Sequence, residues 1–133
     1  YDPASGGFFA DAARTHCEVM TTSMAGMLAL ATGRLQYALA AATFLRRLYE
    51  AQPDLRRGLY TRWTTTLVTE FAAEDAAGHL VDAQKARQWY FQYGIAAAHL
   101  ASVAAVTGDR QWLKLAQDYL CAADYLGEDR YQT

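Results

Sequence analysis

One phrase occurs twice in this chain, and it constrains the fold more than any other feature. The stretch "LATGRLQYALAAATFL" at residues 30–45 returns as "AVTGDRQWLKLAQDYL" at residues 105–120, and the two Thr-Gly pairs are 75 residues apart (107 − 32). In each copy an apolar segment ends at Thr-Gly, and a segment with helical periodicity follows almost at once. Glycine readily takes the left-handed conformation that ends a helix. The repeat therefore predicts two helical hairpins.

The two helices of each predicted hairpin differ in character. The later copy continues with apolar residues at helical spacings of three and four, behind Asp109 as a suitable N-cap. These apolar residues are Trp112, Leu115, Tyr119, Ala123 and Leu126. The first helices, roughly residues 10–32 and 86–107, are apolar on almost every side. Helices of that kind are usually buried, so we expect the first helix of each hairpin to be the inner one.

Between the hairpins the composition changes. The stretch "GLYTRWTTTLVTEF" at residues 58–71 is rich in Thr, Val and aromatic residues, which favours a short β-hairpin. Leu59, Trp63, Leu67 and Phe71 also recur every four residues, so a further helix is the alternative. The predicted fold class is all-α, with this β-hairpin as an insertion. We expect a single domain over residues 1–133, with hairpins at about 10–51 and 86–126 and the insertion at about 52–85.

Composition excludes several classes of protein. With 53% hydrophobic and 20% charged residues in 133, the chain is long enough to fold around one core. A formal net charge of −2 gives no reason to expect nucleic acid as a partner. Residues 88–108 contain no Asp, Glu, Lys or Arg, but six alanines together with Gln92, His99 and Ser102 make this stretch too weakly hydrophobic for a membrane span. We expect a small-molecule partner, no nucleic acid and no membrane.

The two cysteines give no sign of a metal site. Cys17 and Cys121 have no Cys or His partner at metal-ligand spacing, so we expect no metal site. Buried free thiols are the simplest interpretation, although a disulfide between them stays open. We also expect no cofactor and a cytoplasmic location.

These features together resemble a known group of proteins. Helices that end in "TGR" or "TGD", outer helices that open with an aromatic residue, and the entry "GGFF" look like the α/α-toroid superfamily. That superfamily includes the N-acylglucosamine 2-epimerases, the six-hairpin glycosidases and the terpenoid-cyclase-like toroids. The resemblance implies a ring of inner and outer helices around a cavity. A complete toroid has more than two hairpins, so the resemblance also implies additional protein, from a homo-oligomer or from a further segment of the same protein.

In such a ring, the loops that join an outer helix to the next inner helix gather at one end, where ligands bind. The segments that would lie there are rich in aromatic residues, which suit the flat face of a ring-containing substrate. The predicted ligand-binding residues are Phe9, Arg62, Trp63, Trp89, Tyr90 and Tyr93. Ordinary packing of the inner helix is the alternative for Trp89, Tyr90 and Tyr93.

Three residues near the same end are candidate catalytic groups. His16 and His79 could act as general base or acid near neutral pH. Glu70 could form a carboxylate pair with Glu74 or Asp75, as in glycosidases. Each also has a structural alternative, His16 as a cavity-wall residue and the others as solvated loop residues. His99, in "AAAHLAS", is most simply a buried helix residue.

Two functions from different classes follow. The first is an enzyme of the isomerase, cyclase or glycoside-processing type, which acts on a small ring-containing substrate in an aromatic-lined cavity. The alternative is a non-catalytic helical interaction or assembly module. A cavity that joins His16, Trp89 and Tyr93 would favour the enzyme, whereas a flat exposed apolar face would favour the module. In either case we expect Met24, Leu28, Ile95 and Leu100 to need additional protein to cover them.

Overall fold

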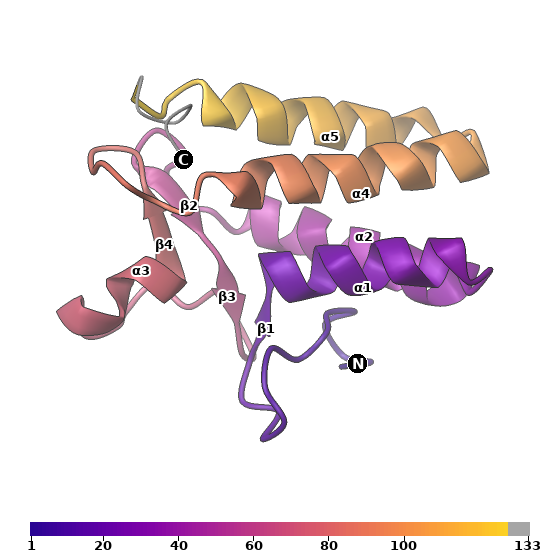
Figure 1. Cartoon of the computed structure of the whole chain (residues 1–133), viewed down its shortest axis with the longest axis horizontal. Helices are drawn as coiled ribbons and strands as arrows, with labels where there is room; N and C mark the ends of the chain where they lie inside the picture. Colours follow the sequence, from indigo (N-terminus) through magenta and orange to yellow (C-terminus); the bar gives the residue numbers. More distant parts are fainter. Residues whose placement is uncertain (128–133) are drawn as a thin grey trace.

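The computed structural model describes residues 1–127 and shows two helical hairpins side by side (Figure 1). The first hairpin consists of α1 (Val19–Ala31) and α2 (Leu35–Glu50), and the second of α4 (Phe91–Thr107) and α5 (Arg110–Ala123). Helices α2 and α5 begin 75 residues apart (110 − 35), which is the offset of the sequence repeat. The repeated phrase is therefore the turn and outer helix of a repeated hairpin.

The two turns have the same glycine geometry. Gly33 and Gly108 both have a φ of 72°, in the left-handed region, and Gly108 is the C-cap of α4. The turns differ in the residue that follows. Asp109 accepts a hydrogen bond from the Gln111 N–H at the start of α5, whereas Arg34 at the same place before α2 makes no side-chain cap.

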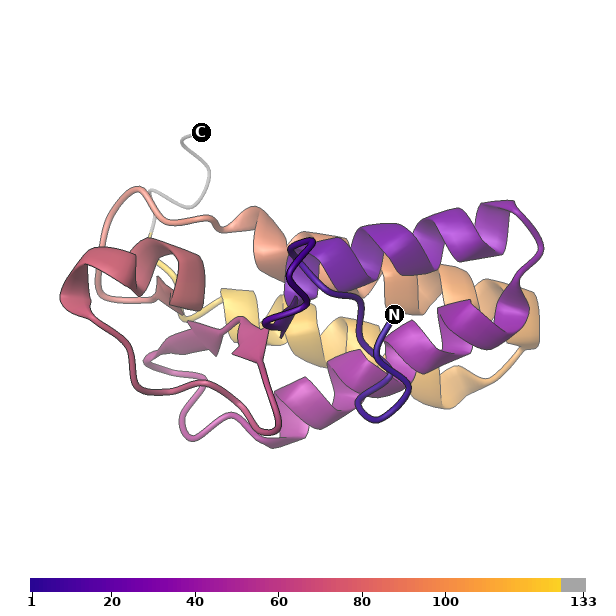
Figure 2. The same ribbon diagram turned by 90° about the horizontal axis from the view of Figure 1, so that it is seen from below.

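The helices form two layers. Seen from below, α1 and α4 lie in one layer and α2 and α5 in the other (Figure 2). Helix α1 packs against α2 and α4, and α4 packs against α5. Helices α2 and α5 bury one face each against α1 and α4, as their amphipathic sequences predict. The prediction that α1 and α4 are inner helices is not met within residues 1–127, because one side of each is exposed, with Leu28 at 65% and Val106 at 62%.

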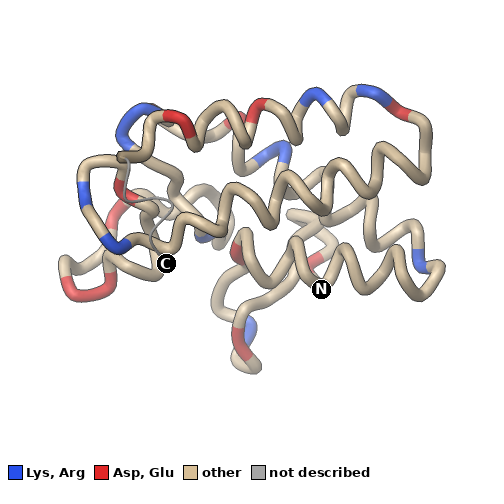
Figure 3. The backbone as a smooth tube through the Cα atoms, turned by 45° about the horizontal axis from the view of Figure 1, so that its top comes forward, with Lys and Arg blue, Asp and Glu red and all other residues tan. Residues whose placement is uncertain are grey.

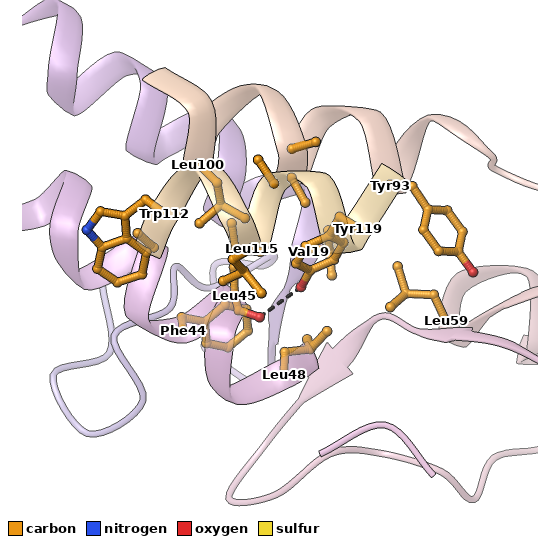
Figure 4. Packing of buried hydrophobic residues seen from close by; sticks show 14 of the residues in the cluster. Val19, Phe44, Leu45, Leu48, Leu59, Tyr93, Leu100, Trp112, Leu115 and Tyr119 are labelled. Atoms are coloured by element: carbon orange, nitrogen blue, oxygen red, sulfur yellow. Dashed lines mark hydrogen bonds between the residues drawn. The ribbon is translucent and has the colours of Figure 1, made fainter. Parts of the chain in front are cut away.

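The main core lies between the layers (Figure 4). Phe44, Leu45 and Leu48 of α2 are fully buried and meet Leu100 of α4. The hydroxyl of Tyr119 in α5 donates a hydrogen bond of 2.8 Å to the Leu45 carbonyl oxygen. This bond ties the two outer helices together inside the apolar core.

Four short strands lie beyond the end where α1 and α4 begin (Figure 1). Strand β1 (Cys17–Glu18) pairs antiparallel with β3 (Arg62–Trp63), and β2 (Gly58–Tyr60) pairs antiparallel with β4 (Leu80–Asp82). A 3-10 turn at Ala73–Asp75 leads into the short helix α3 (Ala76–His79), which precedes β4.

The all-α prediction is wrong, because the described chain is mixed α/β: 53% of it is helical, and two small antiparallel sheets accompany the helices. The predicted local β-hairpin within residues 58–71 is present only as a single antiparallel bridge between Trp63 and Leu67, and the two strands of this stretch pair elsewhere. Strands β2 and β3 are neighbours in sequence, yet each pairs with a more distant segment. Local composition indicated β2 and β3, but their partners lie 20 to 46 residues away in the chain (80 − 60 and 63 − 17).

The first inner helix starts later than predicted, at Val19 instead of about residue 10. Before it the chain folds back on itself, with the Ala10 N–H bound to the His16 carbonyl and Arg14 at a φ of 58°. Gly6, at a φ of 86°, lies so close to α2 that a Cβ would come within 2.6 Å of the Ala40 carbonyl oxygen. Contacts with α2 and β3 thus hold this segment out of a helix.

The second inner helix also starts later than predicted, at Phe91 instead of about residue 86. No helix within residues 1–127 is both long enough and apolar enough to cross a bilayer. Both cysteines are free: Cys17 is buried as expected, whereas Cys121 is exposed, which corrects the expectation of two buried thiols.

Candidate active site

The extended segment around Thr61 joins three distant parts of the chain. Its N–H donates to the His79 carbonyl oxygen at 2.9 Å, and its carbonyl oxygen accepts from the Val19 N–H at 3.0 Å. The Thr61 hydroxyl donates to the Gly78 carbonyl oxygen at 3.0 Å. This buried residue therefore holds the start of α1 and the end of α3 on either side of one extended segment.

Charged residues meet across the β1–β3 pair. Glu18 lies directly opposite Arg62 in the register of the two strands, so their side chains project from the same face. Glu18 is only 8% exposed and accepts a hydrogen bond of 2.6 Å from the Thr21 hydroxyl. His16 directly precedes β1, and the charges of both Glu18 and Arg62 act on its imidazole.

Arg62 is also bound to His79. Its Nη1 donates to His79 Nε2 at 3.3 Å, and His79 Nδ1 donates to the Asp75 carbonyl oxygen at 2.9 Å. These two partners assign the neutral ring with its proton on Nδ1. The imidazole also stacks on Phe71, with 4.7 Å between the ring centres. The ring of His79 is thereby fixed on three sides.

The guanidinium of Arg62 is packed into a tight space. A Cβ on Gly78 would come within 2.5 Å of its Nη2, so a larger residue there would displace the guanidinium. Its Nε is buried and has no hydrogen-bond partner in the described chain. A buried guanidinium nitrogen without an acceptor is costly, and an oxygen atom of a ligand would relieve that cost.

His16 is paired with Asp11. The distance from its Nδ1 to Asp11 Oδ2 is 3.2 Å, and the Thr15 hydroxyl lies 2.9 Å from the same nitrogen. Burial is the main cause that lowers the pKa of His16, and the positive charge of Arg62 adds to it, against Glu18 and Asp11. Hydrogen bonds from the side chain and backbone of Thr15 lower the pKa of Asp11. This environment favours an ionised Asp11 beside a neutral imidazole.

A cleft of about 490 Å³ opens beside this pair. It brings together three of the predicted site residues, Phe9, His16 and Trp63. Arg14 and Arg47 also line it, and Arg47 Nη1 donates to the Ala4 carbonyl oxygen at 2.8 Å. The cleft thus has aromatic walls, an imidazole and two guanidinium groups.

Other predicted site residues lie elsewhere. Tyr90 and Tyr93 line a separate cleft of about 340 Å³ between α4 and α5. Trp89 is exposed and stacks on Phe91, and Glu70 is exposed. Burial raises the pKa of Tyr93 far above its usual value, so its hydroxyl does not ionise near neutral pH. The expected cavity that joins His16, Trp89 and Tyr93 is therefore not formed within the described chain, so this criterion does not favour an enzyme, and the support for one is the separate cleft beside His16.

Asp11 and Glu18 were missed by sequence reasoning. A helix over residues 10–32 would turn Glu18 away from His16, and that expected helix hid the relation between them. The usable signal was the spacing His16-Cys17-Glu18 in an extended chain, which places the histidine and the carboxylate on one side. Within residues 1–127, no three His, Cys, Asp or Glu side chains are arranged as metal ligands.

No protein-family model matches the chain, and neither a curated protein nor a solved structure is significantly similar to it.

Proposed function

We propose that this chain carries an acid–base active site in the cleft beside His16, of the isomerase type, for a small ring-containing substrate. The observation that supports it most is the Asp11–His16 pair at the wall of an aromatic cleft. The Thr15 hydroxyl donates to Asp11 and accepts from His16 Nδ1–H, which leaves Nε2 as the nitrogen that accepts a proton. His16 is the proposed catalytic base, and Asp11 is a positioning residue.

Electrostatics supports the choice of base. Burial and the nearby Arg62 lower the pKa of His16, which keeps its imidazole neutral and ready to take a proton near neutral pH. The guanidinium groups of Arg14 and Arg47 at the cleft would stabilise negative charge that develops on the substrate. In an isomerisation, the proton leaves a substrate carbon, binds to Nε2 and returns to the substrate, so no co-reactant is needed.

The walls of the cleft suggest the class of substrate. Phe9 and Trp63 offer apolar faces to a ring, while Thr64 and Thr65 offer hydroxyl groups. A volume of about 490 Å³ suits a single small molecule. A sugar or a related cyclic hydroxy acid has both an apolar ring face and polar edges.

Exchange of hydrogen with solvent tests this proposal directly. The chain is incubated in D2O with a panel of reducing sugars, sugar acids and cyclic hydroxy acids, and NMR follows loss of carbon-bound proton signals. We expect exchange in at least one member of the panel. Replacing His16 by Gln should lower the exchange rate by about 100-fold or more, because it removes the base and keeps the size of the side chain.

Asp11→Asn separates a positioning role from general stability. It should lower the exchange rate, whereas Asp54→Asn, an exposed carboxylate outside the cleft, should leave the rate unchanged. Melting temperatures of all variants are measured beside the rates. If His16→Gln lowers only the melting temperature, or if the wild-type chain exchanges no member of the panel, the proposal is wrong.

A further inference from the structure

Helices α1 and α4 leave one broad apolar face uncovered. They form one layer of the bundle, and their sides away from α2 and α5 are open in the described chain (Figure 2). Met24 and Leu28 of α1 and Phe91 and Val106 of α4 are all exposed, and Leu28, at 65% exposed, also lines a cleft with Tyr37 at the edge toward α2. We call these four residues and the helix surface between them the inner-helix face. Leu100, which was expected to share it, is fully buried under the layer instead.

This face differs from the rest of the surface in charge. Neither α1 nor α4 contains an Asp, Glu, Lys or Arg, and both are drawn without charge along their length (Figure 3). The outer helices carry charged residues on their solvent side, such as Arg47 and Lys114. A partner for the inner-helix face must therefore be apolar and uncharged itself, which excludes nucleic acid and charged peptides.

The face is somewhat smaller than a standard stable interface. Helix α4 has 17 residues and α1 has 13, so they are about 25 and 20 Å long, and each is roughly 9 Å wide. Together they cover roughly 400 Å² in plan. A stable interface takes at least about 600 Å² from each partner, so a dimer through this face belongs to the small, weaker class.

The chain itself shows which surface fits such helices. Within one molecule, α1 already packs against α4, its counterpart in the repeated hairpin. The contact is close: Gly26 of α1 lies against the ring of His99 of α4. Inner helices of this repeat therefore pack well on one another, and a second copy of the chain offers two more of them with the same uncharged surface.

We infer that the inner-helix face binds a second copy of this chain, which gives a symmetric dimer with α1 and α4 of both copies at its centre. Leu28 and Phe91 would be buried in that dimer. This inference is independent of the proposed active site, because the cleft beside His16 shares none of its lining residues with the inner-helix face.

Light scattering and sedimentation of matched variants test the dimer. At about 100 μM chain, well above a micromolar Kd, we expect the wild type to be a dimer. Leu28→Lys should be a monomer with unchanged circular dichroism. Leu113→Lys, on the exposed side of α5, should remain a dimer, since Leu113 is 41% exposed but lies outside the face.

Three results would overturn the inference: a monomeric wild type, a dimer that persists in Leu28→Lys, or equal dissociation by Leu113→Lys. If Leu28→Lys alters the circular dichroism, Met24→Gln replaces it and the same comparison applies. Flotation with phosphatidylcholine vesicles tests whether the face binds lipid instead of a second copy. A wild-type chain that is monomeric and floats with the vesicles assigns the face to lipid and contradicts the dimer.

Discussion

The imidazole of His99 in α4 fills the space that a side chain would need at Gly26 in α1. A Cβ on Gly26 would stand 2.6 Å from His99 Nε2, and that nitrogen also lies 3.1 Å from the Ala38 carbonyl oxygen in α2. One buried histidine thus fixes the approach of three helices. The glycine inside α1 is explained by this contact and not by any bend in the helix.

Replacing Gly26 by Ala should destabilise the chain, even though Ala is the better helix former. The added methyl group would push His99 away from Ala38, and overpacking of this kind costs about 1–3 kcal/mol of the free energy of unfolding. Gly94→Ala is the matched control, because it also lies in a helix and a Cβ there meets nothing within 4 Å. Urea unfolding should show Gly94→Ala to be neutral or stabilising; equal effects at the two positions would refute the contact.

The stability of the chain should fall in mild acid, in part because of His99. Burial lowers its pKa below the usual 6.5, and the bond to Ala38 opposes this only partly. Nε2–H donates to Ala38, and Nδ1 is buried without a partner in the described chain, so a second proton would have no acceptor. The unfolded chain then binds a proton that the folded chain does not. The contribution of the neutral His99 to the free energy of unfolding should therefore be complete above about pH 6.5. It should decrease as the pH falls toward the pKa of His99 in the folded chain.

The comparison that isolates His99 is urea unfolding at about pH 7.5 and about pH 5.5, for the wild type and for His99→Gln. His16 has a lowered pKa as well and contributes in the same direction, so the variant should lose only part of the pH dependence. An unchanged difference between the two pH values in His99→Gln would show that His99 does not titrate in this way.

The two repeated turns predict opposite effects of capping changes. Asp109→Ala should lower the melting temperature, because the Gln111 N–H loses its acceptor at 3.0 Å. Arg34→Asp should raise it, because the equivalent position before α2 has no side-chain cap and a positive charge there opposes the helix dipole. Calorimetry on both variants measures whether each melting temperature rises or falls. Two changes of the same sign would show that the turns are not equivalent.

Tyr119→Phe should remove a single buried hydrogen bond. Its hydroxyl binds the Leu45 carbonyl oxygen at 2.8 Å inside the core (Figure 4), and such a bond is worth about 1 kcal/mol. Tyr125→Phe provides the control at an exposed tyrosine and should change stability by less than about 0.5 kcal/mol. Chemical denaturation resolves this difference, and similar values for the two variants would contradict the role of the bond.

Local chemistry in the sequence determined the repeated part of this protein. Thr-Gly endings, Asp109 as a cap and apolar residues at spacings of three and four act within a few residues, so the turns at Gly33 and Gly108 and the burial of Trp112, Leu115 and Tyr119 were predictable. The burial of His99 was predicted too, because it lies on a helix that is largely apolar and has no charged residue. These features need no information from distant parts of the chain.

Only the tertiary structure decided the strands and the candidate site. The alanines within residues 10–18 favour a helix locally, but Arg14 takes a φ of 58° and pairing with β3 makes Cys17 and Glu18 a strand, which places Glu18 opposite Arg62. The Arg62–His79 bond and the Asp11–His16 pair follow from that choice. Strand pairing depends on which backbone groups meet, here between residues 20 to 46 positions apart, and the periodicity of side chains in a strand does not indicate its partner.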